Sequence, residues 1–187
     1  MKTAEYLSVL VSIIVGLGLS QVLSGVANLL VDRKRVRFYW IWGVAVTMVF
    51  VANVQFWWST FSVGEAVASN FFSFVFFLLT PIALYLSAVV LVPDFEGEGE
   101  IDLRRHFHEN RRFYFGFLTA VPLLSGARSV LISHDPLLSP ERPYELAFVA
   151  LMASGWLIGR EGWQRFVAVA SVALFVAFIL LAGLQPG

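Results

Sequence analysis

The sequence predicts an all-α membrane protein, a bundle of six transmembrane helices with a short cytoplasmic interfacial helix. Hydrophobic residues make up 58% of the 187 residues, whereas about 45–50% of a soluble domain is apolar. Charged residues make up 14%, against about 25% in a soluble domain. Six apolar stretches also reach or approach the ~20 residues that a helix needs to cross a bilayer. We therefore expect one transmembrane domain over residues 1–187.

The six predicted spans follow one another through mostly short links. They are Ala4–Val31, Phe38–Val63, Val67–Val92, Phe113–Ile132, Pro143–Gly159 and Phe166–Leu184. The first exceeds the ~7–15 residues of a signal-peptide core, so we interpret it as a span. The last consists mostly of Ala, Val, Leu and Phe, which predicts a helix that faces lipid.

The loop 93–112 is the only link long enough for structure of its own. Asp102 is a suitable helix N-cap, because its carboxylate can accept hydrogen bonds from the first backbone N–H groups. An amphipathic helix from this point would place Leu103, Phe107 and Phe113 on lipid and its arginines among headgroups. We therefore expect a short interfacial helix before the fourth span.

Basic residues gather in three of the links. Ten of the 13 Lys and Arg residues lie there, namely Arg33, Lys34, Arg35, Arg37, Arg104, Arg105, Arg111, Arg112, Arg160 and Arg165. Cytoplasmic loops carry such an excess of positive charge. We therefore expect these links in the cytoplasm and both termini on the outer side. The layout resembles that of small bacterial inner-membrane proteins, so we expect that location.

Several kinds of chemistry are not indicated. The net charge is zero, which gives no reason to expect a nucleic-acid partner. The chain has no cysteine, and this excludes disulfides and thiolate ligands. His106 and His108 are two residues apart, so on a helix they point in nearly opposite directions. We expect no metal site, no cofactor and no catalytic residues.

A polar thread runs along the first span, where something small or polar recurs at every fourth residue. Its members are Ser8, Ser12, Gly16, Ser20, Ser24 and Asn28. Gly18, Gln21, Gly25 and Asn28 form a second such face at 3-4-3 spacing. Small residues allow close helix packing in membranes, and hydroxyls can bond across helices. The thread therefore predicts either packing, inside the bundle or across a homo-oligomer, or a polar path through it. A period of four drifts around a helix, so we expect span one to touch several neighbours and to lie centrally.

Arg128 lies inside the fourth predicted span, where an ionisable group is costly and marks a functional-site hypothesis. Further polar residues are expected at the same outer depth, namely Glu5, Asn53, Gln55, Asn70 and Glu145. These positions predict an outward polar vestibule with Arg128 as anchor for an anionic group. The alternative is a structural lock, in which Arg128 pairs with Glu5 or Glu145.

Two functions follow from this arrangement. The first is a channel- or transporter-like protein, a homo-oligomer with a vestibule around Arg128 that takes a small ion, an anion or a lipid. The second is a non-catalytic membrane subunit that binds a partner protein or lipid. An intramembrane enzyme acting on lipid would need His134 and Asp135 near a third polar group.

Overall fold

The computed structural model describes residues 3–60, 71–95, 99–131 and 142–184. Within these residues the chain forms six helices and one pair of very short strands. The elements are α1 (Thr3–Val31), β1 (Val36–Arg37), α2 (Trp40–Ser59), α4 (Phe71–Leu91), β2 (Ile101–Asp102), α5 (Leu103–Leu131), α6 (Arg142–Leu157) and α7 (Glu161–Leu184). The all-α class predicted from the sequence is confirmed.

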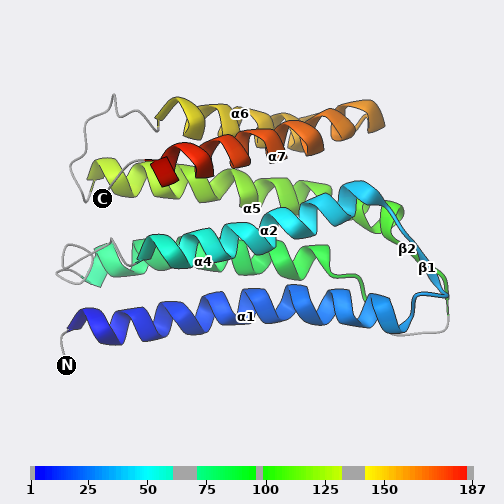
Figure 1. Ribbon diagram of the computed structural model, residues 1–187, viewed down its shortest axis with the longest axis horizontal. Coiled ribbons are helices and arrows are strands. Elements are labelled where there is room, and N and C mark those ends of the chain that lie inside the picture. Colours follow the sequence, from blue (N-terminus) through cyan, green and yellow to red (C-terminus); the bar gives the residue numbers. More distant parts are fainter. Residues whose placement is uncertain (1–2, 61–70, 96–98, 132–141, 185–187) are drawn as a thin grey trace.

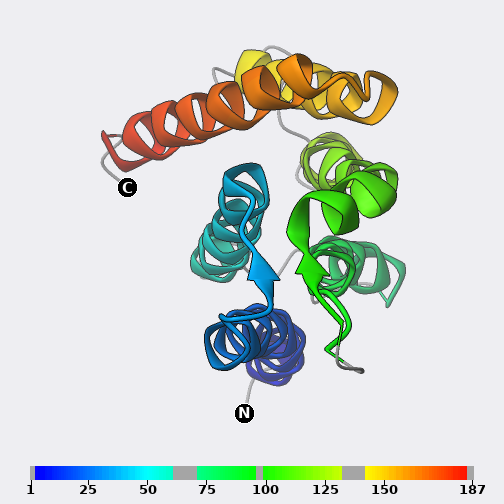
Figure 2. The ribbon, with the colours of Figure 1, turned by 90° about the vertical axis from the view of Figure 1, so that its right-hand side faces the viewer.

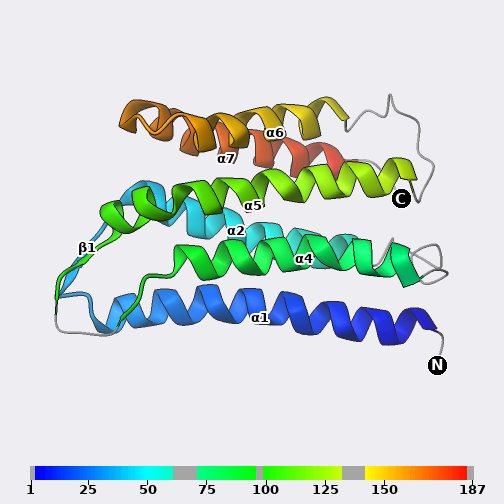
Figure 3. The same ribbon diagram turned by 180° about the vertical axis from the view of Figure 1, so that it is seen from behind.

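The six helices lie along one long axis and alternate in direction (Figures 1 and 3). As a result, the start of α1 and the end of α7 lie at the same end of the bundle, which we call the terminus end. The turn from α1 to α2 and the turn from α6 to α7 lie at the opposite end, the link end (Figure 1). The basic links are therefore gathered together.

Four of these helices are long and apolar enough to cross a membrane, which fits a membrane location. They are α1, α2, α4 and α7. The two others, α5 and α6, are not among these four helices, for separate reasons. α6 has 16 residues, or roughly 24 Å at about 1.5 Å per residue. α5 has 29 residues, but its charged first turns, Pro122 and Arg128 lower its apolar character.

The first helix is not central, in contrast to our prediction. Viewed from the link end, α1 forms one edge of the bundle, α6 and α7 form the other, and α2, α4 and α5 lie between (Figure 2). Among the described helices, α1 packs mainly on α2 and α4. The apolar segment of α1 that could span a membrane is 28% buried, against 44% for that of α4. The polar residues spaced four apart therefore do not show whether α1 lies centrally, because α1 buries a different set of residues.

The interfacial helix is also corrected by the structure. Residues 103–131 form one continuous helix, and Leu103 and Phe107 are buried in the main core, whereas Phe113 is 62% exposed. The Asp102 cap is confirmed, since its Oδ1 accepts hydrogen bonds from the backbone N–H of Arg104 (2.9 Å) and Arg105 (3.0 Å). The parallel β1–β2 pair just before it draws the start of α5 into the bundle, so its apolar residues meet protein rather than lipid.

The core is divided unequally along the bundle. The larger cluster joins all six helices through residues such as Trp42, Leu84, Phe107 and Met152. A smaller cluster of Val11, Val15 and Phe77 lies toward the terminus end. The indole N–H of Trp42 donates to the Leu91 carbonyl at 2.8 Å, which ties α2 to the end of α4.

Candidate functional site

α1 has a buried seam that follows a 4-3 spacing along the helix. Its residues are Val11, Val15, Gly18, Val22, Gly25 and Leu29. Two of them are glycines because there is no room for a side chain. A Cβ on Gly18 would lie 2.8 Å from Asn53 Oδ1 in α2, and one on Gly25 would lie 2.5 Å from Val92 Cγ2, beyond α4. The seam therefore holds α1 against the bundle by close backbone approach.

The predicted thread lies elsewhere on α1. All six of its residues, Ser8, Ser12, Gly16, Ser20, Ser24 and Asn28, are exposed. A Cβ on Gly16 would meet no atom within 4 Å. Near the terminus end the thread meets α2, where Trp57 Nε1 donates to Ser12 Oγ at 3.2 Å. The thread thus passes over the outer surface of α1 instead of lining the bundle interior.

Four polar side chains on this surface make no hydrogen bond to any residue that the structure describes. They are Ser20, Gln21, Ser24 and Asn28, and we call them the outer polar face of α1. Hydroxyls on other helices do form hydrogen bonds: Ser87 donates to the Ala83 carbonyl and Thr119 to the Phe115 carbonyl. Leaving such a group unpaired in an apolar medium costs on the order of 1–3 kcal/mol. The described residues thus leave the hydrogen-bonding groups of the outer polar face without a partner.

The residues predicted to line a vestibule have different surroundings. Asn53 is fully buried, and its Nδ2 donates to the Val49 carbonyl at 2.9 Å. The Arg128 guanidinium lies 5.6 Å from the ring centre of Phe77 in α4, a cation–π distance. Gln55 is half-buried. Asn53 thus faces α1, whereas Arg128 faces α4.

Glu145 forms an ion pair with Arg142 Nη1 at 2.8 Å, one turn earlier in α6. This pair packs on α5, where a Cβ on Gly126 would lie 2.9 Å from Arg142 Nη1. The side chain of Glu5, together with Asn70, His134 and Asp135, lies outside the part of the chain whose side chains are described. The vestibule stays a prediction.

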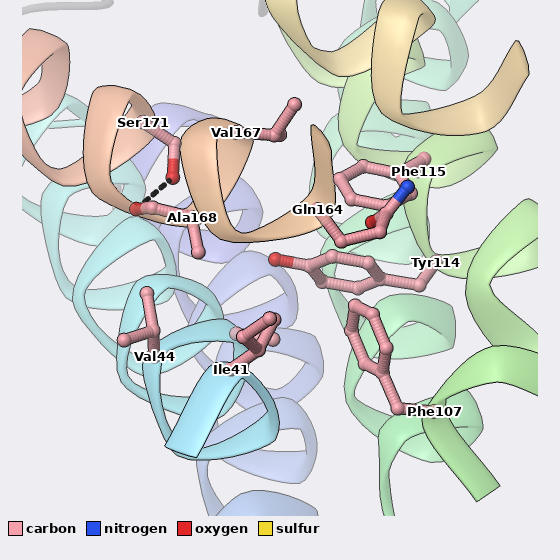
Figure 4. Close-up of a pocket in the computed structure, with 10 residues that line it drawn as sticks. Ile41, Val44, Phe107, Tyr114, Phe115, Gln164, Val167, Ala168 and Ser171 are labelled. Atoms are coloured by element: carbon pink, nitrogen blue, oxygen red, sulfur yellow. Dashed lines mark hydrogen bonds between the residues drawn. The ribbon is translucent and has the colours of Figure 1, made fainter. Parts of the chain in front are cut away.

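A small cavity lies between α2, α5 and α7 in the link half of the bundle (Figure 4). Its volume of about 10 Å³ is close to the minimum for a single water molecule. Gln164 lines it and is fully buried; its Nε2 donates to the Ile158 carbonyl (2.6 Å) and the Gly155 carbonyl (3.0 Å), which joins α7 to the end of α6. Gln164 Oε1 has no partner among the described residues. The cavity is too small for a solute.

Ion pairs concentrate at the link end around Glu161. Its carboxylate accepts from Arg104 Nη2 at 2.7 Å and from Arg165 Nη2 at 3.3 Å. His108 Nε2 lies 3.4 Å away, and the Tyr39 hydroxyl donates at 3.5 Å. Arg35 also donates to the Gly99 carbonyl at 2.8 Å. These contacts tie the three basic links to one another.

Two link-end groups keep their neutral forms. Burial, followed by the nearby Glu161 carboxylate, raises the pKa of Tyr39 to about 12, so the phenol stays protonated near neutral pH. Burial also lowers the pKa of His106, whose Nε2 lies 3.1 Å from the Val90 carbonyl oxygen. The neutral imidazole can donate that hydrogen bond.

Sequence reasoning missed the two residues that organise the α6–α7 turn. Gln164 lies ahead of the predicted sixth span, and Glu161 reads as an ordinary acid in a short link. The one available signal was that Gln164 lies between Trp163 and, after Arg165, a long apolar run that begins at Phe166, where a polar residue needs a partner.

Comparison with known proteins gives no relationship: no family model, no curated protein and no solved structure matches this chain.

Proposed function

We propose that this protein is a non-catalytic membrane subunit of six transmembrane helices, which pairs with a second copy of itself through the outer polar face of α1. One observation carries the proposal. Ser20, Ser24 and Asn28 lie exposed and Gln21 half-buried on a helix long and apolar enough to span a membrane, and the side chain of none has a hydrogen-bond partner among the described residues.

The count of six spans is supported by the chain path. α4 ends at the link end and α7 begins there, so the α5–α6 hairpin must leave that end and return to it. In Figure 3 the hairpin lies alongside α4 and extends to the terminus end. A bilayer that contains α4 and α7 therefore also encloses α5 and α6. We place the link end in the cytoplasm by its basic residues, both termini outside, and the protein in a bacterial inner membrane.

The depth of the outer polar face argues for a helix partner. Ser20 is twelve residues before Asp32 at the link end, or roughly 18 Å at about 1.5 Å per residue. That depth lies within the hydrocarbon core, where water does not satisfy hydrogen-bonding groups. A neighbouring helix can do so, and hydrogen bonds between membrane helices contribute on the order of 0.6 kcal/mol each.

The chemistry of these side chains favours a second copy. Each carboxamide, Gln21 and Asn28, carries both a donor and an acceptor. A two-fold axis along the membrane normal brings like residues together at the same depth. Gln21 of each copy can then bond to its counterpart, while Gly16, Ser20 and Ser24 let the two backbones approach. The interface completes the hydrogen bonds that the single chain leaves open.

The proposal is tested by self-association in liposomes, measured by energy transfer between labelled copies at decreasing protein-to-lipid ratio. The double variant Gln21→Leu/Asn28→Leu should weaken the dimer about tenfold or more, since it removes several hydrogen bonds. Leu23→Ala/Leu30→Ala is the matched control, because both leucines are exposed on α1, also seven residues apart, on another side. Equal association of the wild type and the Gln21/Asn28 variant would reject the proposal.

A channel- or transporter-like function is the second candidate. It is favoured by Arg128, a half-buried cation near the terminus end of α5. Such a function requires water to reach this position, whereas a structural role keeps it dry. The test is Arg128→Cys in the cysteine-free chain, with a membrane-impermeant thiol reagent added from outside. Labelling of Arg128→Cys and of Gln55→Cys supports a vestibule, and protection of both in folded protein argues against one.

A further inference from the structure

Two arginines near the α5–α6 contact at the link end are exposed cations. Arg112 and Arg160 have no ion pair and no side-chain hydrogen bond to the residues that the structure describes. They differ in this from Arg104, Arg105 and Arg165, each of which pairs with a glutamate. Their charge is available to a ligand.

Arg111 brings these two arginines to one corner of the bundle. Its Nη1 donates to the Trp156 carbonyl at 2.9 Å, near the end of α6. Its Nη2 lies 2.6 Å from where a Cβ on Gly159 would stand. Arg112 follows Arg111 and Arg160 follows Gly159, so this contact brings the chain at Arg112 and the chain at Arg160 to the same corner of the bundle.

The nearby carboxylates do not neutralise this corner. Glu109 lies one turn before Arg112 but binds Arg105 at 2.8 Å. Glu161 follows Arg160 but is bound by Arg104 at 2.7 Å and Arg165 at 3.3 Å. Among the described residues, the corner therefore keeps a positive charge that neighbouring carboxylates do not balance.

Apolar side chains border the corner on the side of the membrane. Phe113 is 62% exposed, Trp156 48% and Leu157 71%. Exposed aromatic residues next to arginines mark the level of the headgroups in membrane proteins. A ligand that fits both parts carries an anionic phosphate next to long apolar chains.

We propose that Arg112 and Arg160, placed by Arg111, bind the phosphate of an anionic phospholipid in the cytoplasmic leaflet. Guanidinium groups bind phosphate through paired, charge-assisted hydrogen bonds. Basic sites between membrane helices on the cytoplasmic side hold anionic headgroups in this way. A free phosphate ester shares the charge but leaves Phe113, Trp156 and Leu157 uncovered. This inference goes beyond self-association and depends only on the membrane placement proposed above.

The test is lipid binding to the purified full chain in detergent, followed by native mass spectrometry during titration with phosphatidylglycerol or phosphatidylcholine. The wild type should bind phosphatidylglycerol more tightly. The double variant Arg112→Gln/Arg160→Gln should bind it roughly 30-fold more weakly, from the typical contribution of a basic residue at a membrane surface. Glycerol 3-phosphate at millimolar concentration should not displace the lipid.

The matched control is Arg33→Gln/Lys34→Gln, which removes two exposed cations from the first link and alters the net charge equally. It should change binding less than threefold. Circular dichroism and thermal unfolding confirm that both variants fold. The proposal is overturned by wild-type affinity in the Arg112/Arg160 variant, by an equal loss in the control, by equal binding of the two lipids, or by displacement with glycerol 3-phosphate.

Discussion

The two sides of α1 use the same small residues for different purposes. On the inner side, Gly18 and Gly25 lie in a buried seam, where added Cβ atoms would overlap Asn53 and Val92. On the outer side, Gly16 has open space around it, and the serines near it are exposed. The inner side assembles the bundle, and we assign the outer side to pairing with a second copy.

The comparison shows that a glycine in a membrane helix has no fixed meaning. What a glycine contributes depends on which neighbour approaches it, and the neighbours of α1 are other helices, α2 and α4. The polarity of the side chains distinguishes the inner from the outer side of α1 better than the glycines do. The seam carries only valine, leucine and glycine, whereas the hydroxyl and amide groups lie outside it.

The largest effect on folding is expected from Gly25→Ala. Its new methyl would lie 2.5 Å from Val92 Cγ2, and overpacking of this kind costs about 1–3 kcal/mol in the free energy of unfolding. Gly16→Ala is the control, and it should leave stability unchanged or raise it by up to about 1 kcal/mol, the helix preference of Ala over Gly. Thermal unfolding in detergent measures both. Equal melting temperatures for the two variants would show that the seam is not tightly packed.

A smaller effect, confined to association, is expected from Ser24→Phe. The bulky ring would keep a second α1 from close approach, so the dimer should weaken about tenfold, or roughly 1.4 kcal/mol. The melting temperature of the monomer should stay within about 2 °C of the wild type, because surface changes seldom exceed ~0.5 kcal/mol. Energy transfer in liposomes and thermal unfolding report the two quantities separately. A loss of stability without a loss of association would contradict the assignment of sides.

A small net effect, the difference of two opposing contributions, is expected from Asn53→Leu in α2. The change loses the hydrogen bond to the Val49 carbonyl but also removes Oδ1, which is buried without a partner among the described residues. The lost hydrogen bond destabilises the fold and the removal of the unpartnered oxygen stabilises it, and Asn and Leu are similar in size. The free energy of unfolding should therefore change by less than about 1.5 kcal/mol. Thermal unfolding is again the measurement. A loss above 3 kcal/mol would mean that Asn53 has a further partner, such as a bound water.

Composition and apolar length were enough to predict the all-α class and the positions of most helices. Asp102 was also predictable as a cap, since local chemistry alone decides it. The central position of span one and the interfacial helix were wrong. Both depend on distant contacts, such as the pairing of β1 with β2, which bury Leu103 and Phe107 instead of leaving them on lipid.

The polar residues of the first span were found from spacing, but their side of the helix was not. Spacing fixes which residues share a side of α1, and only packing decides whether that side turns inward or outward. Glu161 and Gln164 could not be identified for the same reason, because their partners lie on α5 and at the end of α6.

The most direct test of the two-sided account of α1 uses single cysteines, since the chain has none of its own. A disulfide forms only when the two Cα atoms come within about 7 Å. After oxidation in native membranes, Ser20→Cys and Ser24→Cys should give covalent dimers, whereas Val15→Cys and Val22→Cys in the seam should stay monomeric. Dimers at the seam, or none at Ser20 and Ser24 in correctly inserted protein, would contradict the account.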